Sequence, residues 1–460
     1  MPHPTAVLNI VGLTESRIGA HTPRLRAFLE SASLTRLAPP LPALTTTSQA
    51  AMLTGVPVRA HGIVGNGWYD RESAEIRFWK QSNHLVRAEK VWETARRRDP
   101  SATCAKLFWW YNMYSSADWS VTPRPIYKAD GRKIPDCAAE PPALRDELQD
   151  ELGRFPLFQF WGPGASIESS AWIARAAARV WERHRPTLNL VYLPHLDYAL
   201  QKFGPGSEES RRADAEIDRV VGSLIDRFDA DGVRTMLVSE YGIEPVTGAV
   251  LINRALREAG LVRVRVEDGL EMLDPGASRA FAVADHQVAH VYVRNGSDLA
   301  AVRALCERTP GVETVLDDDG KRAHAIDHER AGDLVLVAEA GRWFAYPYWL
   351  EDARAPDFAR TVEIHRKPGY DPCELFVDPA IRGPKAAIGW RLLKKRLGFR
   401  TLMDVIPLDP SLVRGSHGRR PSTPGDAPVM ITRHGGGGGE MPMEGVRDRI
   451  LEHLFSDEPG

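Results

Sequence analysis

Cysteine is scarce in this chain, with four residues in 460. They are Cys104, Cys137, Cys306 and Cys373, and no two of them have CxxC spacing. A zinc knuckle or a framework of disulfide bonds needs a regular cysteine pattern, so the sequence argues against both. The predicted location is a reduced cytoplasm.

Long apolar runs are also missing. No window approaches about 18 uncharged apolar residues, so no membrane span is predicted. The apolar stretch at residues 6–13, AVLNIVGL, is too short for the hydrophobic region of a signal peptide with its flanks. No small-residue cleavage site follows it cleanly, which agrees with a cytoplasmic protein.

An excess of one charge is absent, because 59 basic and 61 acidic residues give a net charge of −2. The clearest basic run is residues 391–400 (RLLKKRLGFR), which we interpret as the solvated face of one helix. We therefore expect no binding to a nucleic-acid polymer. The chain also lacks a GxGxxG after its first apolar run, a GxSxG elbow and a Walker A motif. These absences argue against Rossmann, α/β-hydrolase and P-loop NTPase folds.

Short apolar runs alternate with amphipathic stretches along the chain. The pattern predicts buried strands at residues 6–13, 188–197, 233–242 and 333–341, and helices at residues 22–32, 169–184, 207–228 and 253–259. Strands that alternate with helices predict an α/β fold with a mostly parallel central sheet and helices on both faces. Ligands of such sheets bind at the carboxyl ends of the strands, so polar residues there are the first candidates.

Two segments break this pattern. Residues 108–136 are rich in aromatic, proline and turn residues, and residues 346–402 hold the sequence HRKPGYDP and a basic helix. We predict both to be insertions that form a cap rather than sheet elements. A glycine run then predicts a flexible linker before a last helix. The expected organisation is a main domain over residues 1–434, followed by the linker and helix over residues 435–460.

Three threonines stand together in Leu41–Gly55 (LPALTTTSQAAMLTG), before a run that can start a helix. A threonine at such a position can cap the helix, its hydroxyl accepting a backbone N–H. With its hydroxyl ionised by a metal, it can instead attack phosphorus. These residues alone leave both roles open.

The chain continues as VPVRAHGIVGNGWYD. The whole stretch resembles the type I phosphodiesterase/nucleotide pyrophosphatase branch of the alkaline phosphatase superfamily, in which a nucleophilic threonine precedes a TG dipeptide and an HGIxxN segment. Thr54-Gly55 and the segment ending at Asn66 match in order and spacing. The resemblance implies an alkaline-phosphatase-like fold with an inserted cap, and Thr45 as the nucleophile. It also implies that Asn66 donates a hydrogen bond to a phosphoryl oxygen.

Weaker matches follow along the chain. YLPHLDYALQKFGP resembles a family strand that ends in Asp, LVSEYG resembles SDHG, and GSHG resembles the last family motif. The metal-ligand positions that these matches imply are Asp197, Gln201, Glu240, Tyr241 and His417, with Val11 where the family has another Asp. The implied cofactor is a divalent metal, one or two ions of zinc or manganese. Zinc prefers imidazole and carboxylate donors, so the Gln, Tyr and Val are departures.

The departures leave three hypotheses. The metal site is rebuilt from other residues, or a single ion acts with Arg414, Arg366 or Lys367 supplying the missing charge, or catalysis has been lost. The candidates for substitute ligands are His195, His365, Asp371, Asp285 and His286. The alternative for His365 and Asp371 is a proline-fixed loop, and for Asp285 and His286 it is an ion pair or hydrogen bond at a strand end.

Aromatic residues gather between residues 68 and 119. Family members hold the organic group of the ester in an aromatic pocket, which implies substrate binding by Trp68, Tyr69, Trp110 and Tyr111. The alternative is a hydrophobic cap that packs on itself.

We therefore predict a metal-dependent hydrolase that acts through Thr45 on a small-molecule phosphate ester, either a phosphodiester or a nucleotide pyrophosphate. One alternative is a catalytically degenerate member that binds a ligand or serves as a biosynthetic partner. Another is a hydrolase of phosphonate or sulfate esters. The oligomeric state is left open.

Overall fold

Nine strands form the main sheet, in a computed structural model that describes residues 2–456. Their order across the sheet is β23, β2, β22, β11, β1, β10, β5, β6 and β9. Their bounds are β1 Thr5–Ile10, β2 Ser33–Ala38, β5 Cys104–Leu107, β6 Trp119–Pro123, β9 Cys137–Glu140, β10 Leu188–Leu193, β11 Arg234–Val238, β22 Val429–Thr432 and β23 Glu440–Pro442.

Strand β1 lies at the middle of this sheet. It pairs in parallel with β10 on one side and β11 on the other, with Thr5 opposite both Leu188 and Arg234. β5 and β6 continue the parallel order, whereas β22 and β9 run antiparallel to their neighbours. Every residue of β1 and β10 is buried, as expected of strands covered on both faces. The mostly parallel α/β sheet predicted from the sequence is confirmed.

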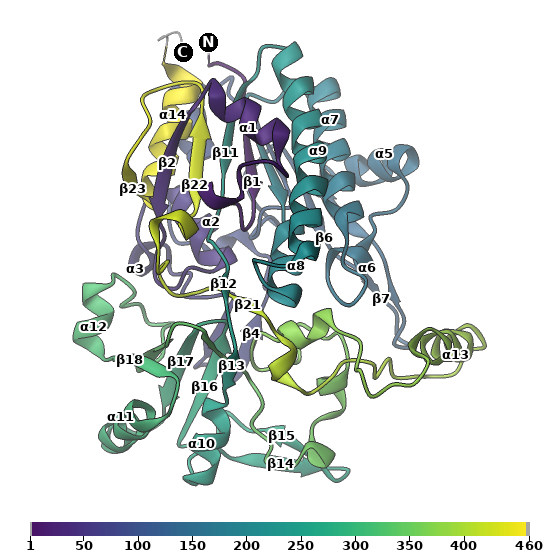
Figure 1. The fold of residues 1–460 in the computed structure, drawn as a ribbon, viewed down its shortest axis with the longest axis vertical. Helices are drawn as coiled ribbons and strands as arrows, with labels where there is room; N and C mark the ends of the chain where they lie inside the picture. Colours follow the sequence, from purple (N-terminus) through teal and green to yellow (C-terminus); the bar gives the residue numbers. More distant parts are fainter. Residues whose placement is uncertain (1, 457–460) are drawn as a thin grey trace.

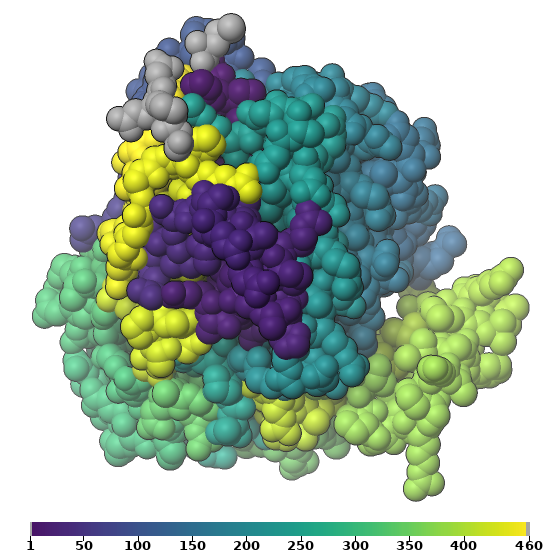
Figure 2. Space-filling model, turned by 45° about the horizontal axis from the view of Figure 1, so that its top comes forward, coloured from purple at the N-terminus to yellow at the C-terminus, as the bar shows by residue number. Residues whose placement is uncertain are grey.

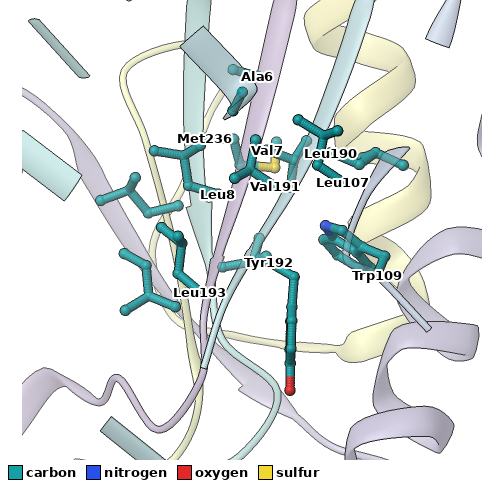
Figure 3. Packing of buried hydrophobic residues seen from close by; sticks show 14 of the residues in the cluster. Ala6, Val7, Leu8, Leu107, Trp109, Leu190, Val191, Tyr192, Leu193 and Met236 are labelled. Carbon is teal, nitrogen blue, oxygen red and sulfur yellow. The ribbon is translucent and has the colours of Figure 1, made fainter. Parts of the chain in front are cut away.

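Apolar side chains of the central strands form the main core (Figure 3). Val7, Leu107 and Leu190 lie around β1, β5 and β10 and are completely buried. Each such side chain contributes roughly 1.5–3 kcal/mol when it leaves water. Tyr192, near the end of β10, points its hydroxyl away from this cluster. The carboxyl end of the sheet is thus where apolar packing gives way to polar groups.

Helices cover both faces of the main sheet (Figure 1). α1, α7, α8 and α9 form one group, in which α7 contacts β10 and α9 contacts β11. α2, α4 and α14 form another, in which α14 contacts β1. The helix bounds are α1 Pro23–Glu30, α2 Thr45–Thr54, α3 Val58–His61, α4 Val91–Arg98, α5 Ala143–Leu152, α6 Leu157–Phe160, α7 Ile167–His184, α8 His195–Phe203, α9 Glu208–Ala230 and α14 Val446–Phe455.

Between β11 and β22 the chain forms a second unit, which fills the lower half of Figure 1. Its centre is an antiparallel sheet in the order β16, β17, β19, β18. The bounds are β12 Glu244–Pro245, β13 Gly248–Val250, α10 Ile252–Glu258, β14 Val264–Glu267, β15 Leu270–Leu273, β16 Ala280–Asp285, β17 Val288–Val293, α11 Leu299–Arg308, β18 Val312–Leu316, α12 Asp318–Ala323, β19 Leu334–Ala338, β20 Arg342–Phe344, α13 Pro384–Arg396 and β21 Gly415–Ser416.

One predicted strand joins the other sheet. The run at residues 333–341 becomes β19, which pairs antiparallel with β17 and β18 in the second unit, so its assignment to the parallel sheet is wrong. An apolar run identifies a buried strand but carries no information on which partner it pairs with.

The segments predicted as insertions and linker also contribute to the main domain. Within residues 108–136, β6 is a strand of the main sheet, so the expectation of no sheet element there is wrong. The rest forms a hairpin of β7 (Ile126–Tyr127) and β8 (Lys133–Ile134), and the earlier pair is β3 (Gly67–Asp70) with β4 (Glu75–Phe78). After the glycine run, β23 pairs with β2, and α14 buries apolar residues in the main core.

All four cysteines are buried with free thiols. Within residues 2–456, no helix has the length and apolar character to cross a membrane.

Candidate active site

A cavity of about 1710 Å³ lies where the main sheet faces the second unit. Segments that follow β2, β10 and β11 bring Thr45, Asp197 and Tyr241 to its wall, at the carboxyl ends of the strands. His286 and Tyr370 line it from the second unit. Candidates from distant parts of the sequence therefore meet at one cavity.

The three adjacent threonines at the start of α2 have different contacts. Thr47 Oγ1 accepts the backbone N–H of the residue before the helix at 3.2 Å, which closes the first turn. Thr46 Oγ1 donates to the Gly65 carbonyl at 2.8 Å. Thr45 Oγ1 instead lies 3.0 Å from the Tyr241 hydroxyl oxygen and lines the cavity. Capping falls to Thr47, which leaves the Thr45 hydroxyl accessible to a ligand.

The Tyr241 hydroxyl bridges Thr45 and Asp197. It donates to Asp197 Oδ1 at 3.2 Å, so its oxygen can accept the Thr45 proton. Burial raises the pKa of Asp197 to about 7, against the opposing effect of its hydrogen bonds from Tyr241 and Gln201. Burial also raises the pKa of Tyr241 well above its ordinary value, so the phenol keeps its proton. The three groups form a continuous path for a proton.

Gln201, one of the metal-ligand positions that the resemblance implies, holds the Asp197 carboxylate. Its Nε2 donates to Asp197 Oδ2 at 2.7 Å, and its Oε1 accepts the Tyr370 hydroxyl at 2.9 Å. Because a carboxylate only accepts, the amide NH₂ has to face Asp197. Gln201 is therefore a hydrogen-bond donor to the carboxylate rather than a second ligand beside it.

The GSHG segment that carries His417 begins in β21 and requires its glycines. A Cβ at Gly415 would lie 2.2 Å from the Leu200 carbonyl oxygen, and Gly418 has a φ of +123°. A side chain at either position would collide with the backbone or strain it, so both positions require glycine.

His417 is buried beside Asp197. Its Nδ1–H donates to the Ala43 carbonyl at 2.8 Å, and its ring stacks on Tyr241 with centroids 3.5 Å apart. The other nitrogen, Nε2, lies 3.8 Å from Asp197 Oδ1 and has no hydrogen-bond partner among residues 2–456. Burial lowers the pKa of His417 well below its ordinary value, so the imidazole is neutral.

Glu240 is tied to the core below the cavity. Its Oε1 accepts hydrogen bonds from Asn9 Nδ2 and Gln49 Nε2, each at 2.6 Å. Burial raises the pKa of Glu240 to about 8, despite the opposing effect of these bonds. Val11 is completely buried in the main core and offers no donor atom.

Asn66 is held in a buried network. Its Oδ1 accepts the Thr46 backbone N–H at 3.2 Å, and its Nδ2 donates to Asp285 Oδ1 at 3.1 Å. His286 Nδ1 bonds the same carboxyl oxygen at 2.9 Å. This contact matches the alternative to metal binding for Asp285 and His286, a hydrogen bond or ion pair at a strand end. Asn66 does not line the described cavity, so its donation to a phosphoryl oxygen stays a prediction.

The donor set at this site does not fit the metal centre that the resemblance implies. Val11 has no ligand atom, Gln201 donates to Asp197, and the Tyr241 phenol is protonated. Asp197 and His417 remain as a pair, whereas a catalytic zinc site uses three protein ligands. Within residues 2–456, no group of three or more His, Cys, Asp or Glu side chains could hold an ion.

Of the substitute ligands, His286 packs against His417 with ring centroids 3.8 Å apart, and three others have different partners. His195 Nε2 bonds Glu216 at 2.9 Å, His365 Nδ1 lies 3.3 Å from the Phe78 carbonyl, and Asp371 pairs with Lys367. The structure thus places these three in separate local networks. Of the proposed positive charges, Lys367 is paired with carboxylates and Arg366 lies 3.3 Å from Asp357.

We expect zinc and manganese to leave the melting temperature of the purified protein unchanged, because a ligand stabilises a fold only when it binds the native state. Thermal unfolding with excess metal and after chelation, together with elemental analysis, checks this. One retained equivalent, with a melting temperature that falls on chelation, would contradict it and indicate an ion at Asp197 and His417.

The four aromatic residues that were predicted to bind substrate differ in their position relative to the cavity. Trp68, Tyr69 and Trp110 line the cavity, whereas Tyr111 is buried and does not. Trp110 packs on Trp79 with ring centroids 4.8 Å apart. Other lining aromatic residues were not singled out as substrate-binding; they include Trp79, Trp161, Tyr192, Tyr198 and Tyr370. No periodic pattern marks them, because they come from loops and different elements.

Residues 346–402 reach the site through a buried charged cluster. Lys367 Nζ lies 2.6 Å from Asp371 Oδ2 and 2.7 Å from Glu374 Oε1. Glu374 Oε2 accepts the indole N–H of Trp161 at 2.5 Å. The cluster fixes the loop from which Tyr370 contacts Gln201.

Solved structures of known proteins share the overall fold of this chain. A phosphonoacetate hydrolase from Sinorhizobium meliloti 1021 is 16% identical, has a TM-score of 0.61, and the alignment covers 98% of this chain and 95% of that one. Murine ectonucleotide pyrophosphatase/phosphodiesterase 5 is 13% identical, with a TM-score of 0.59 and coverage of 99% and 97%. These likenesses show the alkaline-phosphatase-like fold.

A curated relative matches in part. An uncharacterized pyrophosphatase/phosphodiesterase of Schizosaccharomyces pombe is 24% identical over 242 residues, which span 50% of this chain and 42% of the relative. The model of the type I phosphodiesterase/nucleotide pyrophosphatase family matches residues 5–371. The chain belongs to the type I phosphodiesterase/nucleotide pyrophosphatase family, a family of hydrolases within the alkaline phosphatase superfamily.

Proposed function

We propose that this chain hydrolyses phosphate esters with Thr45 as the nucleophile. The observation that carries the proposal is the path from the Thr45 hydroxyl through Tyr241 to Asp197 on the wall of a large cavity. A threonine hydroxyl is a weak nucleophile until an adjacent group takes its proton. The family membership supports the same class of reaction.

In the first half of the proposed reaction, Thr45 Oγ1 bonds to phosphorus as the bond from phosphorus to the leaving oxygen breaks. The Thr45 proton passes to the Tyr241 oxygen, and the Tyr241 proton passes to Asp197. The leaving alkoxide takes a proton from solvent and departs as an alcohol. In the second half, water attacks the phosphothreonine and loses a proton to solvent, while Asp197 returns its proton through Tyr241 to the departing Thr45 oxygen.

The zinc or manganese requirement implied by the resemblance has no part in this mechanism, because the donors do not fit it. The cytoplasmic location likewise stays a prediction.

The cavity wall favours a large anionic ester. Lysine and arginine residues outnumber aspartate and glutamate on it, and aromatic rings such as Trp79, Trp110 and Trp161 supply flat apolar surfaces. An inactive threonine-to-alanine variant of the murine relative is described in complex with AMP, and the bacterial relative with phosphonoacetate. Nucleotide phosphodiesters, pyrophosphates and phosphonates are therefore the first substrates to test.

Tyr241→Phe is expected to lower kcat/KM for bis(p-nitrophenyl) phosphate by about 10²-fold or more, because it removes the proton path and keeps the ring. The matched control is Tyr348→Phe, which removes a buried hydroxyl that donates to the Glu271 carbonyl at 3.0 Å, outside the cavity. Full turnover by Tyr241→Phe would exclude the path; equal losses in both variants would indicate a structural effect.

A second candidate is a ligand-binding protein without turnover, which the altered ligand positions Val11, Gln201 and Tyr241 favour. Calorimetry with AMP separates the two. Binding of AMP, with no hydrolysis of any phosphodiester, pyrophosphate, phosphonate or sulfate ester by the wild type, would support this candidate over the hydrolase.

A further inference from the structure

Helix α13 stands out from the second unit (Figure 1, and at the lower right of Figure 2). None of its residues is buried, and no other described helix or strand packs extensively along it. An ion pair between Arg391 and Asp404, at 2.7 Å, ties it to the following loop. A helix of this length is marginal in water by itself, so its exposed surface is a place where a partner would add stability.

Several apolar side chains of α13 face solvent. Trp390, Leu393 and Leu397 are 55%, 45% and 65% exposed, and their spacing places them in one stripe along the helix. Phe399 and Leu402, just beyond the helix, are 64% and 48% exposed. Such a stripe normally packs on the protein core, but here it lies on the outside.

The same segment is strongly basic. Residues 379–403 contain seven lysines and arginines and no aspartate or glutamate. Arg391 is the one of these seven that forms an ion pair among the described residues. Lys394 Nζ lies 5.3 Å from the centre of the Trp390 ring. The methylene groups of Lys394 therefore cover part of the apolar stripe, and its ammonium group lies next to the stripe. Tryptophan and leucine next to unpaired basic residues match a surface with an apolar interior and negative headgroups.

This surface is continuous with the mouth of the cavity. Leu392, Lys395 and Leu402 line the cavity as well. The hairpin of β7 and β8 adds Tyr127, which is 55% exposed and also lines the cavity. Arg400 Nη2 donates to the Ala129 carbonyl in that hairpin at 3.5 Å. The apolar and basic groups therefore gather on one rim.

We propose that α13 and residues 397–402 dock on an anionic lipid bilayer. The stripe of Trp390, Leu393 and Leu397 enters the interfacial region, and the basic residues contact the negatively charged headgroups. The chain is then a peripheral membrane protein whose cavity opens next to the bilayer. This docking does not depend on the chemistry proposed for Thr45.

Co-sedimentation of the full chain with vesicles tests the proposal. We expect binding to vesicles of phosphatidylcholine mixed with phosphatidylglycerol, weaker binding to phosphatidylcholine alone, and a decrease as salt is added. The double variant Trp390→Glu with Leu393→Glu should lower the partition coefficient for the mixed vesicles by at least about tenfold, since it removes apolar contacts and adds like charge.

The matched control is Val266→Glu with Leu350→Glu. These residues are 57% and 47% exposed, lie elsewhere on the second unit, and should leave vesicle binding unchanged. All four positions are solvent-exposed, and equal melting temperatures will show that both variants are folded. Failure of the wild type to bind the mixed vesicles would overturn the proposal, as would wild-type binding by the Trp390 and Leu393 variant. If light scattering shows a dimer of the wild type that this variant dissociates, the surface of α13 binds a second copy of the chain instead of a bilayer.

Discussion

Thr45→Ala is expected to lower kcat/KM for a phosphodiester on the order of 10⁴-fold or more, because it removes the atom that bonds to phosphorus. The fold should change little. The Thr45 hydroxyl lies within hydrogen-bonding distance of Tyr241, and the helix start is closed by Thr47. Steady-state kinetics of the variant on the best substrate of the wild type measures the effect.

Two variants make this result specific. Thr45→Ser keeps a hydroxyl at the same place and should retain measurable turnover. Thr54→Ala, at the other end of α2, removes a buried hydroxyl that donates to the Ala50 carbonyl at 2.6 Å and should leave kcat unchanged. Mass spectrometry of quenched wild-type reactions should detect phosphate on Thr45. Undiminished turnover by Thr45→Ala would refute the nucleophile.

Lys367→Met is expected to lower the free energy of unfolding by about 3–5 kcal/mol, because it leaves two carboxylates buried without a cation. Lys367 and Glu374 are each 1% exposed. Burial opposes the charge on Lys367, but Asp371 and Glu374 together raise the pKa of Lys367 to about 12. Equilibrium unfolding in urea at neutral pH measures the change.

Two exposed ion pairs of one arginine supply the comparison for Lys367. Arg303 contacts Glu307 at 2.8 Å and Asp317 at 2.6 Å on the surface of the second unit. Arg303→Met should cost less than about 1 kcal/mol, since water replaces the lost contacts. A similarly small cost for Lys367→Met would mean that the cluster relaxes or takes up protons. It would then have no special part in fixing the loop around Tyr370.

The central strands could be predicted from the sequence because their signal is local. The runs at residues 6–13, 188–197 and 233–242 became β1, β10 and β11, which are mostly apolar because both faces of the sheet are covered. β22 and β6 were missed. Both are short. β22 pairs with β11 and β2 from distant parts of the chain, which no local pattern encodes, whereas β6 lies in a segment whose aromatic, proline and turn residues predicted a cap.

The candidate site could be predicted where its residues belong to sequence motifs that occur in the family order. Thr45, Asp197 and Tyr241 were each named from a motif, and the structure brings them within hydrogen-bonding distance. The contact of Tyr370 with Gln201 could not be predicted, because it joins helix α8 to a loop 169 residues further along the chain. The basic run at residues 391–400 was interpreted as a solvated face, but its helix begins at Pro384 and also exposes an apolar stripe.

The order of strands has a consequence for how the protein is made. β2, which leads directly to Thr45, has β22 and β23 as its sheet neighbours, and both come after residue 428. During synthesis the candidate nucleophile emerges early, yet the strand before it has no partner until nearly the whole chain has left the ribosome. Such long-range pairing forms late in folding. A nascent chain, or one cut before β22, is therefore expected to carry Thr45 without an assembled active site.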